Sequence, residues 1–397
     1  MVKRAGRVIV VGAGIAGLAT ALRCHQAGWD VLVIERAQGR RSSGYLVNLL
    51  GHGYDAADRL GVLPELKGRD LGAFTSILVK ADGRQKFAIP AEIAQAALGA
   101  RAITVFRGDL ESALFEAVHD NVPIRFGTTV RSVSQNANGV EVALSDGTSE
   151  RADLLVGADG VHSGVREIVF GPEPGFRVDF QHLVAAFPLD KEPEDVPKGA
   201  GTTYIGPGRT AAVINLGPDR SSAFFTYRDA AGETELARGP AHALTTAFGD
   251  LGGGVPAALD RLTAAPADAY FDSVSQITMD AWSRGRVVLV GDAAWCVTLF
   301  AGYGAALALT GADRLGAALE THGLDVSSAL VRWEESLRDE VQKRQALARK
   351  GMSQYAPASS AHVLARELMI RAVRLPPLRR LVQRSVQRAN ARAADRP

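Results

Sequence analysis

A glycine-rich turn, Gly12-Ala13-Gly14-Ile15-Ala16-Gly17, constrains the fold of this chain more than any other feature. It directly follows Arg7–Val11, an apolar run that predicts a short buried strand. It opens a stretch from about Ile15 to Ala27 that predicts a helix, with Gly28 placed to end it. The next segment, WDVLVIER, predicts a second strand. A strand, a helix and a strand in this order predict a parallel sheet covered by helices.

The three glycines of this turn also predict a ligand. Gly12 permits the tight turn, Gly14 lets the backbone approach a pyrophosphate, and Gly17 allows close packing of helix on strand. The helix start presents free N–H groups to phosphates. Glu35 ends the second strand, where a carboxylate can bind a ribose hydroxyl. We therefore expect a dinucleotide here, and the alternative is a turn that serves packing alone.

The pattern of apolar and polar residues changes after this first strand–helix–strand unit. Apolar and polar residues alternate from 128 to 160, and Asn138-Gly139 and Asp146-Gly147 predict hairpin turns. Short strands separated by Gly/Pro turns then run from about Phe176 to Asp272, which predicts an antiparallel sheet. The strand–helix pattern returns at GRVVLVGDAAW, so the antiparallel sheet is expected to be an insertion.

The predicted fold class is therefore α/β, with a Rossmann-like nucleotide-binding domain, an inserted antiparallel β-sheet domain and C-terminal helices. From Ser327 onward the pattern is helical, beginning with a serine that can cap a helix. The expected boundaries are 1–70, 106–175 and 276–325 for the nucleotide-binding domain, 71–105 and 176–275 for the inserted domain, and 326–397 for the helical region.

Two further motifs contain candidate ligand-binding residues. In DLLVGADGVHSGVR, an apolar strand ends in Asp159-Gly160, although a strand that ends in a capped turn also explains this pattern. In GDAAWCVTLFAGYGAALAL, Asp292 is the one ionisable acid and there is no His, Lys or Arg. Asp292 follows an apolar strand, where it can accept hydrogen bonds from sugar hydroxyls. Gly302 and Gly304 stand at the expected start of a helix.

These three motifs in this order, together with VFRGDLESAL, resemble the FAD-dependent monooxygenases of the aromatic hydroxylase type. This family includes 4-hydroxybenzoate hydroxylase and the tetracycline-inactivating enzymes, and the resemblance covers roughly Arg7 to Leu319. It implies that NAD(P)H reduces FAD and that O2 then adds to form a C4a-hydroperoxyflavin. One oxygen atom passes from it to an aromatic or polyketide-like small molecule. The flavin carries this chemistry, so no catalytic side chain is expected.

The resemblance also implies a set of cofactor-binding residues. A helix that starts beside the flavin ring would favour the negative charge of the reduced ring without a cationic side chain. Asp159 and Gly160 match a motif tied to both FAD and NAD(P)H. The residues implied to bind the cofactor are Gly12, Gly14, Ala16, Gly17, Glu35, Arg36, Arg41, Arg107, Asp159, Asp292, Gly302, Gly304 and Ala305.

The chain departs from the family pattern at three positions. Trp295, Leu299 and Tyr303 replace the usual histidine, proline and glutamine. Either the loop tolerates such changes, or Trp295 and Tyr303 reshape the pocket for a flat, apolar substrate. The residues expected in the substrate pocket are Tyr204, Phe225, Tyr227, Trp295, Leu299 and Tyr303.

Alternation along the strand around these aromatic residues predicts two faces. Phe225 and Tyr227 should lie on one face of the sheet, and Phe224 and Arg228 on the other. For any one of them, an ordinary place in the core of the sheet is the competing interpretation.

Composition excludes several classes of function. A net charge of +2 gives no nucleic-acid signature, and no HExxH, CxxC or GxSxG motif points to a metal site or a hydrolase. The two cysteines, Cys24 and Cys296, cannot form a disulfide framework, so we expect a cytoplasmic protein. The apolar N-terminal run mimics a secretory signal but is too short to span a bilayer. A monomer or a homodimer is expected.

Two alternatives remain open from the sequence. The same scaffold can perform Baeyer–Villiger insertion, epoxidation or a two-electron oxidation. The arginine-rich segment RELMIRAVRLPPLRRLVQRSVQRANARA suits a membrane-associated, non-catalytic flavin-binding module, because it mixes arginine with apolar residues. We expect instead a terminal helix that packs on the FAD-binding domain with solvated arginines, and no membrane partner.

Overall fold

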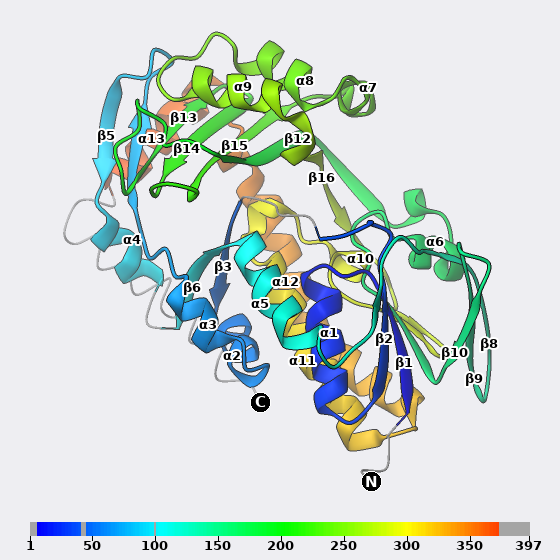
Figure 1. Ribbon diagram of the computed structural model, residues 1–397. Helices are drawn as coiled ribbons and strands as arrows, with labels where there is room; N and C mark the ends of the chain where they lie inside the picture. The colour runs from blue at the N-terminus through cyan, green and yellow to red at the C-terminus, as the bar shows by residue number, and fades with distance from the viewer. Residues whose placement is uncertain (1–5, 41–44, 99–100, 373–397) are drawn as a thin grey trace.

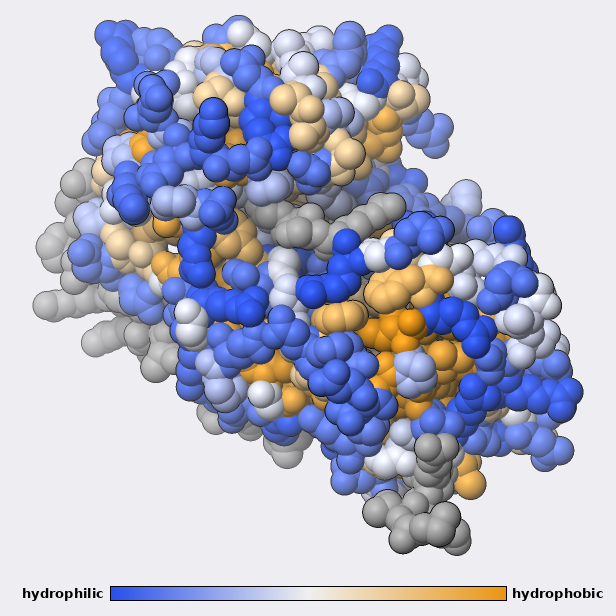
Figure 2. Space-filling model, viewed as in Figure 1, coloured by the Kyte–Doolittle hydropathy of each residue, from blue (hydrophilic) through white to orange (hydrophobic). Residues whose placement is uncertain are grey.

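The structure is a computed structural model that describes residues 6–40, 45–98 and 101–372 of the chain. The predicted cofactor ligand Arg41 lies outside these residues, as does the arginine-rich segment from 373 onward. Figure 1 shows two layered bodies, one around the N-terminal strands and one around a large sheet near the top. The visible outer face is mostly hydrophilic, with apolar side chains showing between the elements (Figure 2).

The N-terminal body is built on a six-stranded sheet of order β17-β18-β11-β1-β2-β7. β1 pairs in parallel with both β2 and β11, and only β17 runs antiparallel to its neighbour. The strands are β1 (Arg7–Val11), β2 (Asp30–Ile34), β7 (Ile124–Arg125), β11 (Leu154–Gly157), β17 (Ser283–Arg284) and β18 (Val287–Leu289). The predicted α/β class and the parallel β1–α1–β2 opening are confirmed, with α1 at Ile15–Gln26.

Helices and a second small sheet sandwich the six-stranded sheet. The residues of β1 from Val8 to Val10 are fully buried, because both faces of the strand are covered. α1 packs against α5 (Arg107–Val118) and α11 (Gly304–His322). A three-stranded antiparallel sheet of β8 (Val130–Asn136), β9 (Gly139–Leu144) and β10 (Ser149–Ala152) follows the two predicted hairpin turns.

The upper body contains a seven-stranded sheet of order β16-β12-β15-β14-β13-β4-β5. Its strands are β4 (Thr75–Val79), β5 (Gln85–Ile89), β12 (Arg177–Leu189), β13 (Ala200–Gly206), β14 (Arg209–Asn215), β15 (Ser221–Arg228) and β16 (Tyr270–Ile277). The sheet is antiparallel except between β4 and β13, which run parallel. The division of the chain at the expected domain boundaries stays a prediction.

One face of the seven-stranded sheet is covered by helices (Figure 1). These are α7 (Gly232–Arg238), α8 (Pro240–Phe248) and α9 (Val255–Ala264). Phe225 and Tyr227 point to this side and pack with Phe248, while Phe224 packs on the other side with Val184. The predicted alternation along β15 is therefore confirmed.

The chain after residue 325 is helical as predicted, although its details differ from expectation. Asp325, not a serine, caps α12 (Val326–Tyr355) by accepting a hydrogen bond from the amide of Ser328. α13 (Ser360–Ala372) packs on the seven-stranded sheet through an ion pair between Lys86 and Glu367. The expected packing of the arginine-rich terminal helix on the FAD-binding domain stays a prediction, because most of that segment lies outside the described residues.

The remaining elements connect these layers. β3 (Leu46–Leu50) pairs with β6 (Ala102–Phe106) in a two-stranded sheet that leads into α5. The other helices are α2 (His52–Arg59), α3 (Leu63–Gly68), α4 (Ala91–Leu98), α6 (Gly164–Phe170) and α10 (Asp292–Trp295), with 3₁₀ turns at Glu173–Gly175, Pro266–Asp268 and Leu299–Ala301. No helix of the described residues is long and apolar enough to cross a membrane.

Candidate active site

The glycine turn between β1 and α1 has the geometry that its sequence predicts. Gly12 has a φ of +105°, and a Cβ added there would lie 2.5 Å from the carbonyl oxygen of Ala158. A Cβ on Gly17 would lie 1.8 Å from the carbonyl oxygen of Gly12. Only glycine fits either position, so α1 packs tightly against the ends of β1 and β11. α1 has no side-chain cap at Gly14, which leaves its first N–H groups for an anion.

Glu35 is held beside this turn by main-chain amides. Its carboxylate accepts hydrogen bonds of 2.8 Å from the N–H of Ala13 and of 2.8 Å from the N–H of Ala37. The side chain remains half-exposed, so further acceptor positions on its oxygens are open. The neighbouring Arg36 is exposed.

Arg107 and Asp292 form the charged centre of the site. Arg107 begins α5, and its guanidinium donates to the Glu111 carboxylate at 2.6 Å. Asp292 begins α10; its side chain has solvent access, yet loss of hydration raises the pKa of its carboxyl and Arg107 partly offsets the rise. A carboxyl that has lost hydration beside a guanidinium and still has solvent access can accept hydrogen bonds from a ligand.

The loop before α11 leaves open space. Gly302 adopts the left-handed conformation with a φ of +62°, and α11 begins two residues later at Gly304. A Cβ added at either glycine would meet nothing within 4 Å. α11 has no side-chain cap, so its first N–H groups at Gly304 and Ala305 face no capping group. Open space at an uncapped helix start is suited to an electron-rich ring.

Asp159 ends the second motif in a capped turn. Its carboxylate accepts from the Ser163 hydroxyl at 2.5 Å and from the Val165 amide at 3.0 Å, and burial raises the pKa of this carboxyl. The fully buried Arg166 then donates to the carbonyl oxygen of Ala293 at 3.0 Å. The motif therefore joins α6 to α10, and its contacts explain Asp159 without a ligand.

Three of the expected pocket residues lie in the core. Phe225 and Tyr227 are 0% and 8% exposed, beneath α8 on the helix-covered face of the seven-stranded sheet. Trp295 is 2% exposed and packs against Trp282 and Trp333, with ring centroids 4.7 and 5.8 Å away. Their burial favours a packing role for all three, and their expected place in a substrate pocket stays a prediction.

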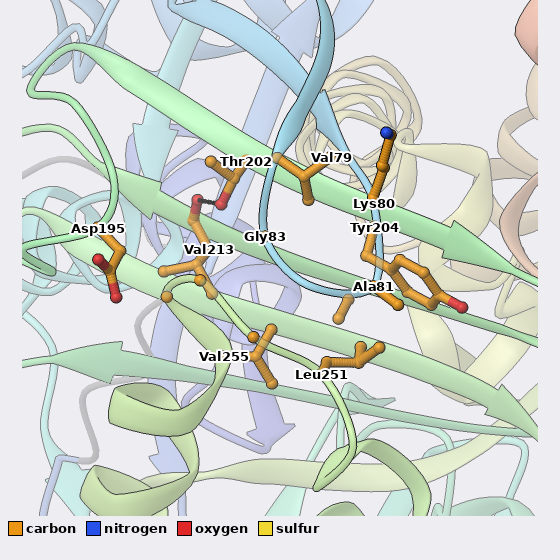
Figure 3. Close-up of a pocket in the computed structure, with 14 residues that line it drawn as sticks. Val79, Lys80, Ala81, Gly83, Asp195, Thr202, Tyr204, Val213, Leu251 and Val255 are labelled. Carbon is orange, nitrogen blue, oxygen red and sulfur yellow. Dashed lines mark hydrogen bonds between the residues drawn. The ribbon is translucent and has the colours of Figure 1, made fainter.

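The other three expected pocket residues, Tyr204, Tyr303 and Leu299, lie in different parts of the fold. Tyr204 lines a small pocket on the helix-covered face, beside Leu251 and the turn that joins β4 to β5 (Figure 3). Tyr303 carries the Arg344 guanidinium 3.5 Å above its ring, on the α12 side of the loop. Leu299 packs with Phe224 on the face of the seven-stranded sheet opposite to α8, where Tyr355 of α12 also packs. Of these three, Leu299 alone lies on that face.

Sequence reasoning missed two tyrosines of the site. Tyr45 precedes β3, and its carbonyl oxygen accepts from the Arg107 amide at 2.8 Å. Tyr270 begins β16 on the face of the seven-stranded sheet opposite to α8, and the rings of Tyr45 and Tyr270 are 5.9 Å apart. Both phenols lie near enough to Asp292 for its charge to raise their pKa. No pattern in the sequence links them, because neither belongs to one of the three motifs.

The fold, the glycine turn and the open helix start define a protein that binds a flavin dinucleotide. The FAD binding domain family matches residues 6–323, and the chain belongs to this family. The protein is an FAD-dependent monooxygenase of the aromatic hydroxylase type, as its relatives show. Within the described residues, no group of three or more His, Cys, Asp and Glu side chains is arranged to hold a metal ion.

Curated relatives and solved structures agree on this family. The chain is 30% identical over 330 residues to FAD-dependent monooxygenase asL4 of Sarocladium schorii, covering 80% of this chain and 76% of the relative. It is 27% identical to a flavin-dependent monooxygenase of Legionella longbeachae, with 85% and 87% covered. The crystal structure of tetracycline destructase Tet(51) superposes with a TM-score of 0.79 at 25% identity, covering 97% of this chain and 96% of that one. Klebsiella pneumoniae HpxO complexed with FAD and uric acid shares the fold, with a TM-score of 0.75, 24% identity, and 98% and 96% covered.

Proposed function

We propose that this monooxygenase takes electrons from NAD(P)H and inserts one oxygen atom from O2 into an aromatic or polyketide-like small molecule. The observation that carries the proposal is the open space beside Gly302 and Gly304 at the uncapped start of α11. That space lies at a helix end whose partial positive charge favours a reduced, negatively charged ring. The likeness to a tetracycline destructase supports a substrate with fused rings.

The residues of the site fit FAD. The turn of Gly12, Gly14 and Gly17 would hold the pyrophosphate on the start of α1, and Glu35 would bind the ribose. Asp292 would accept hydrogen bonds from the sugar chain. When bound, FAD supplies electron transfer from NAD(P)H and the activation of O2 at its C4a position. The protein supplies binding, orientation and a site of low hydration.

The substrate would lie against the face of the seven-stranded sheet that is opposite to α8. This face carries the half-buried Phe224 and Tyr270, with Leu299 of the loop packed beside them. Apolar walls with few polar groups are typical of sites for flat organic ligands. We therefore keep Leu299 in the proposed pocket and add Phe224, which sits on the opposite side of β15 from Phe225.

The test combines a spectrum, an oxidation rate and a product mass. The purified protein should show flavin absorbance, and the right member of a panel of fused-ring phenols and ketones should speed up NAD(P)H oxidation. Under ¹⁸O2 the product should gain one labelled atom. A labelled ester or epoxide would show Baeyer–Villiger insertion or epoxidation in place of hydroxylation. An unlabelled product would show a two-electron oxidation.

A matched pair of variants makes the test specific to the site. Asp292→Asn removes the charge at the proposed sugar contact and should lower retention of FAD, while Asp280→Asn changes an exposed residue and should not. Equal FAD content in both variants and the wild type would remove Asp292 from the proposed site. Protein that cannot be loaded with FAD would contradict the whole assignment.

A further inference from the structure

Two phenol side chains from different parts of the fold contact each other beside the proposed site. Tyr45 lies at the start of the strand pair that leads into α5, and Tyr270 lies at the start of β16. Their rings are 5.9 Å apart and inclined at 48°. The Arg107 guanidinium lies 5.9 Å from the ring of Tyr45. The pair therefore joins the FAD-binding body to the seven-stranded sheet.

The hydroxyl groups of this pair are available to a ligand. Among the described residues, neither hydroxyl has a hydrogen-bond partner, and neither is shut off from solvent. Both hydroxyls can therefore donate to water or to a ligand, and a ligand oxygen that replaces this water keeps each donor satisfied. Two such donors at one place are suited to a ligand that carries acceptor oxygens.

The surroundings keep both phenols protonated. Loss of hydration raises the pKa of Tyr45 to about 12, and it raises the pKa of Tyr270 well above its ordinary value. Asp292 adds to the rise at both residues, and Asp272 adds to it at Tyr270. At neutral pH both groups are therefore neutral donors.

The charges and apolar side chains around the two tyrosines limit which class of ligand can bind there. The carboxylates of Asp292 and Asp272 disfavour a second negative charge beside Tyr270. Val184 and Phe224 give the sheet side of the place an apolar surface. The Arg107 guanidinium lies on the Tyr45 side of the pair, so this repulsion is confined to the side of Tyr270. A neutral, flat ligand with a carbonyl oxygen satisfies both donors and covers the apolar wall, whereas a carboxylate or phenolate beside Tyr270 is repelled by the two aspartates.

We propose that Tyr45 and Tyr270 are specificity-determining residues whose hydroxyls bind the carbonyl oxygens of a neutral, flat substrate. This inference rests on the proposed function, because it places the substrate of that reaction between the two bodies. It names a substrate class, the fused-ring ketones, that the cofactor motifs do not specify.

The test measures binding to the FAD-loaded protein and needs no turnover. Xanthone is the probe, and xanthene, which has a CH2 group in place of the carbonyl, is its matched partner. Dissociation constants come from calorimetry or equilibrium dialysis for the wild type, Tyr45→Phe, Tyr270→Phe and the double variant. Tyr204→Phe is the control, since Tyr204 lines the small pocket on the opposite face of the sheet (Figure 3).

The wild type should bind xanthone more tightly than xanthene. Each single variant should weaken xanthone binding about three- to tenfold, the range of one neutral hydrogen bond, and leave xanthene binding unchanged. Tyr204→Phe should match the wild type for both probes. A variant that weakens both probes equally would show a packing role and overturn the proposal, as would a wild type that binds xanthone no better than xanthene or binds neither.

Different results would refute the proposed function and this inference. Absence of NAD(P)H oxidation and of oxygen transfer with every substrate would refute the oxygen insertion but leave the xanthone measurements standing. Conversely, normal oxygen transfer with unchanged xanthone affinity in both phenylalanine variants would refute the role of the two hydroxyls alone.

Discussion

Replacement of Trp295 by alanine should destabilise the protein by about 3–5 kcal/mol and leave its choice of substrate unchanged. The indole is 2% exposed and belongs to a cluster with Trp282 and Trp333. It also fills the space that a Cβ on Gly311 would need, since that atom would lie 2.9 Å from the ring. The side chain therefore packs between α11 and α12, not against a substrate.

The magnitude follows from what the substitution removes. Loss of a buried tryptophan leaves a cavity between two helices and costs about 3–5 kcal/mol. Part of that loss is the pair of ring contacts with Trp282 and Trp333, each worth about 0.5–1.5 kcal/mol beyond the buried area. Against a total stability of about 5–15 kcal/mol, the effect is large.

Urea unfolding followed by circular dichroism measures this loss, and a substrate panel scored by stimulated NAD(P)H oxidation measures specificity. Leu347→Ala is the control, because Leu347 is 58% exposed on α12 and its loss should change stability by less than about 0.5 kcal/mol. Wild-type stability of Trp295→Ala together with a reordered preference for substrates would refute the packing role and restore the pocket role.

Three further perturbations test the packing around the cofactor site. Gly17→Ala should lower the FAD content of the purified protein, because its Cβ would lie 1.8 Å from a carbonyl oxygen of the glycine turn; unchanged flavin absorbance would contradict this. His162 contacts Asp272 and Glu173. Its hydrogen bonds to these two carboxylates raise its pKa, and the bond to Asp272 is the larger cause. The stabilisation that protonated His162 gives the fold is therefore fully present below about pH 6.5, the ordinary pKa of histidine. It is lost as the pH rises through the raised pKa of the folded protein. His162→Gln should lower the urea midpoint at pH 5.5 more than at pH 9, and an equal loss at both would be inconsistent with ion pairing. Arg166→Met should cost about 3–5 kcal/mol, because it leaves buried carbonyl groups and a carboxylate without their donor; a change in the urea midpoint too small to measure would argue against that.

Local requirements of the backbone explain why part of the site can be predicted from sequence. Gly12 needs a positive φ and Gly17 needs a missing Cβ, and both needs arise within the same turn. The two faces of β15 follow in the same way from the two-residue period of a strand. The order of strand, glycine turn, helix and strand therefore sufficed for the parallel opening and for the dinucleotide site.

What the sequence alone determined is this local geometry, together with the family that its three motifs define. It could not say which face of the seven-stranded sheet the helices cover, so it could not predict that Phe225 packs beneath α8 while Phe224 lies on the other face. Nor could it show that Trp295 turns toward α12. The pairing of Tyr45 with Tyr270 was decided only by tertiary structure, because the two residues belong to distant segments that meet when one body packs on the other. Contacts of this kind depend on the packing of whole layers, which leaves no periodic signal in the chain.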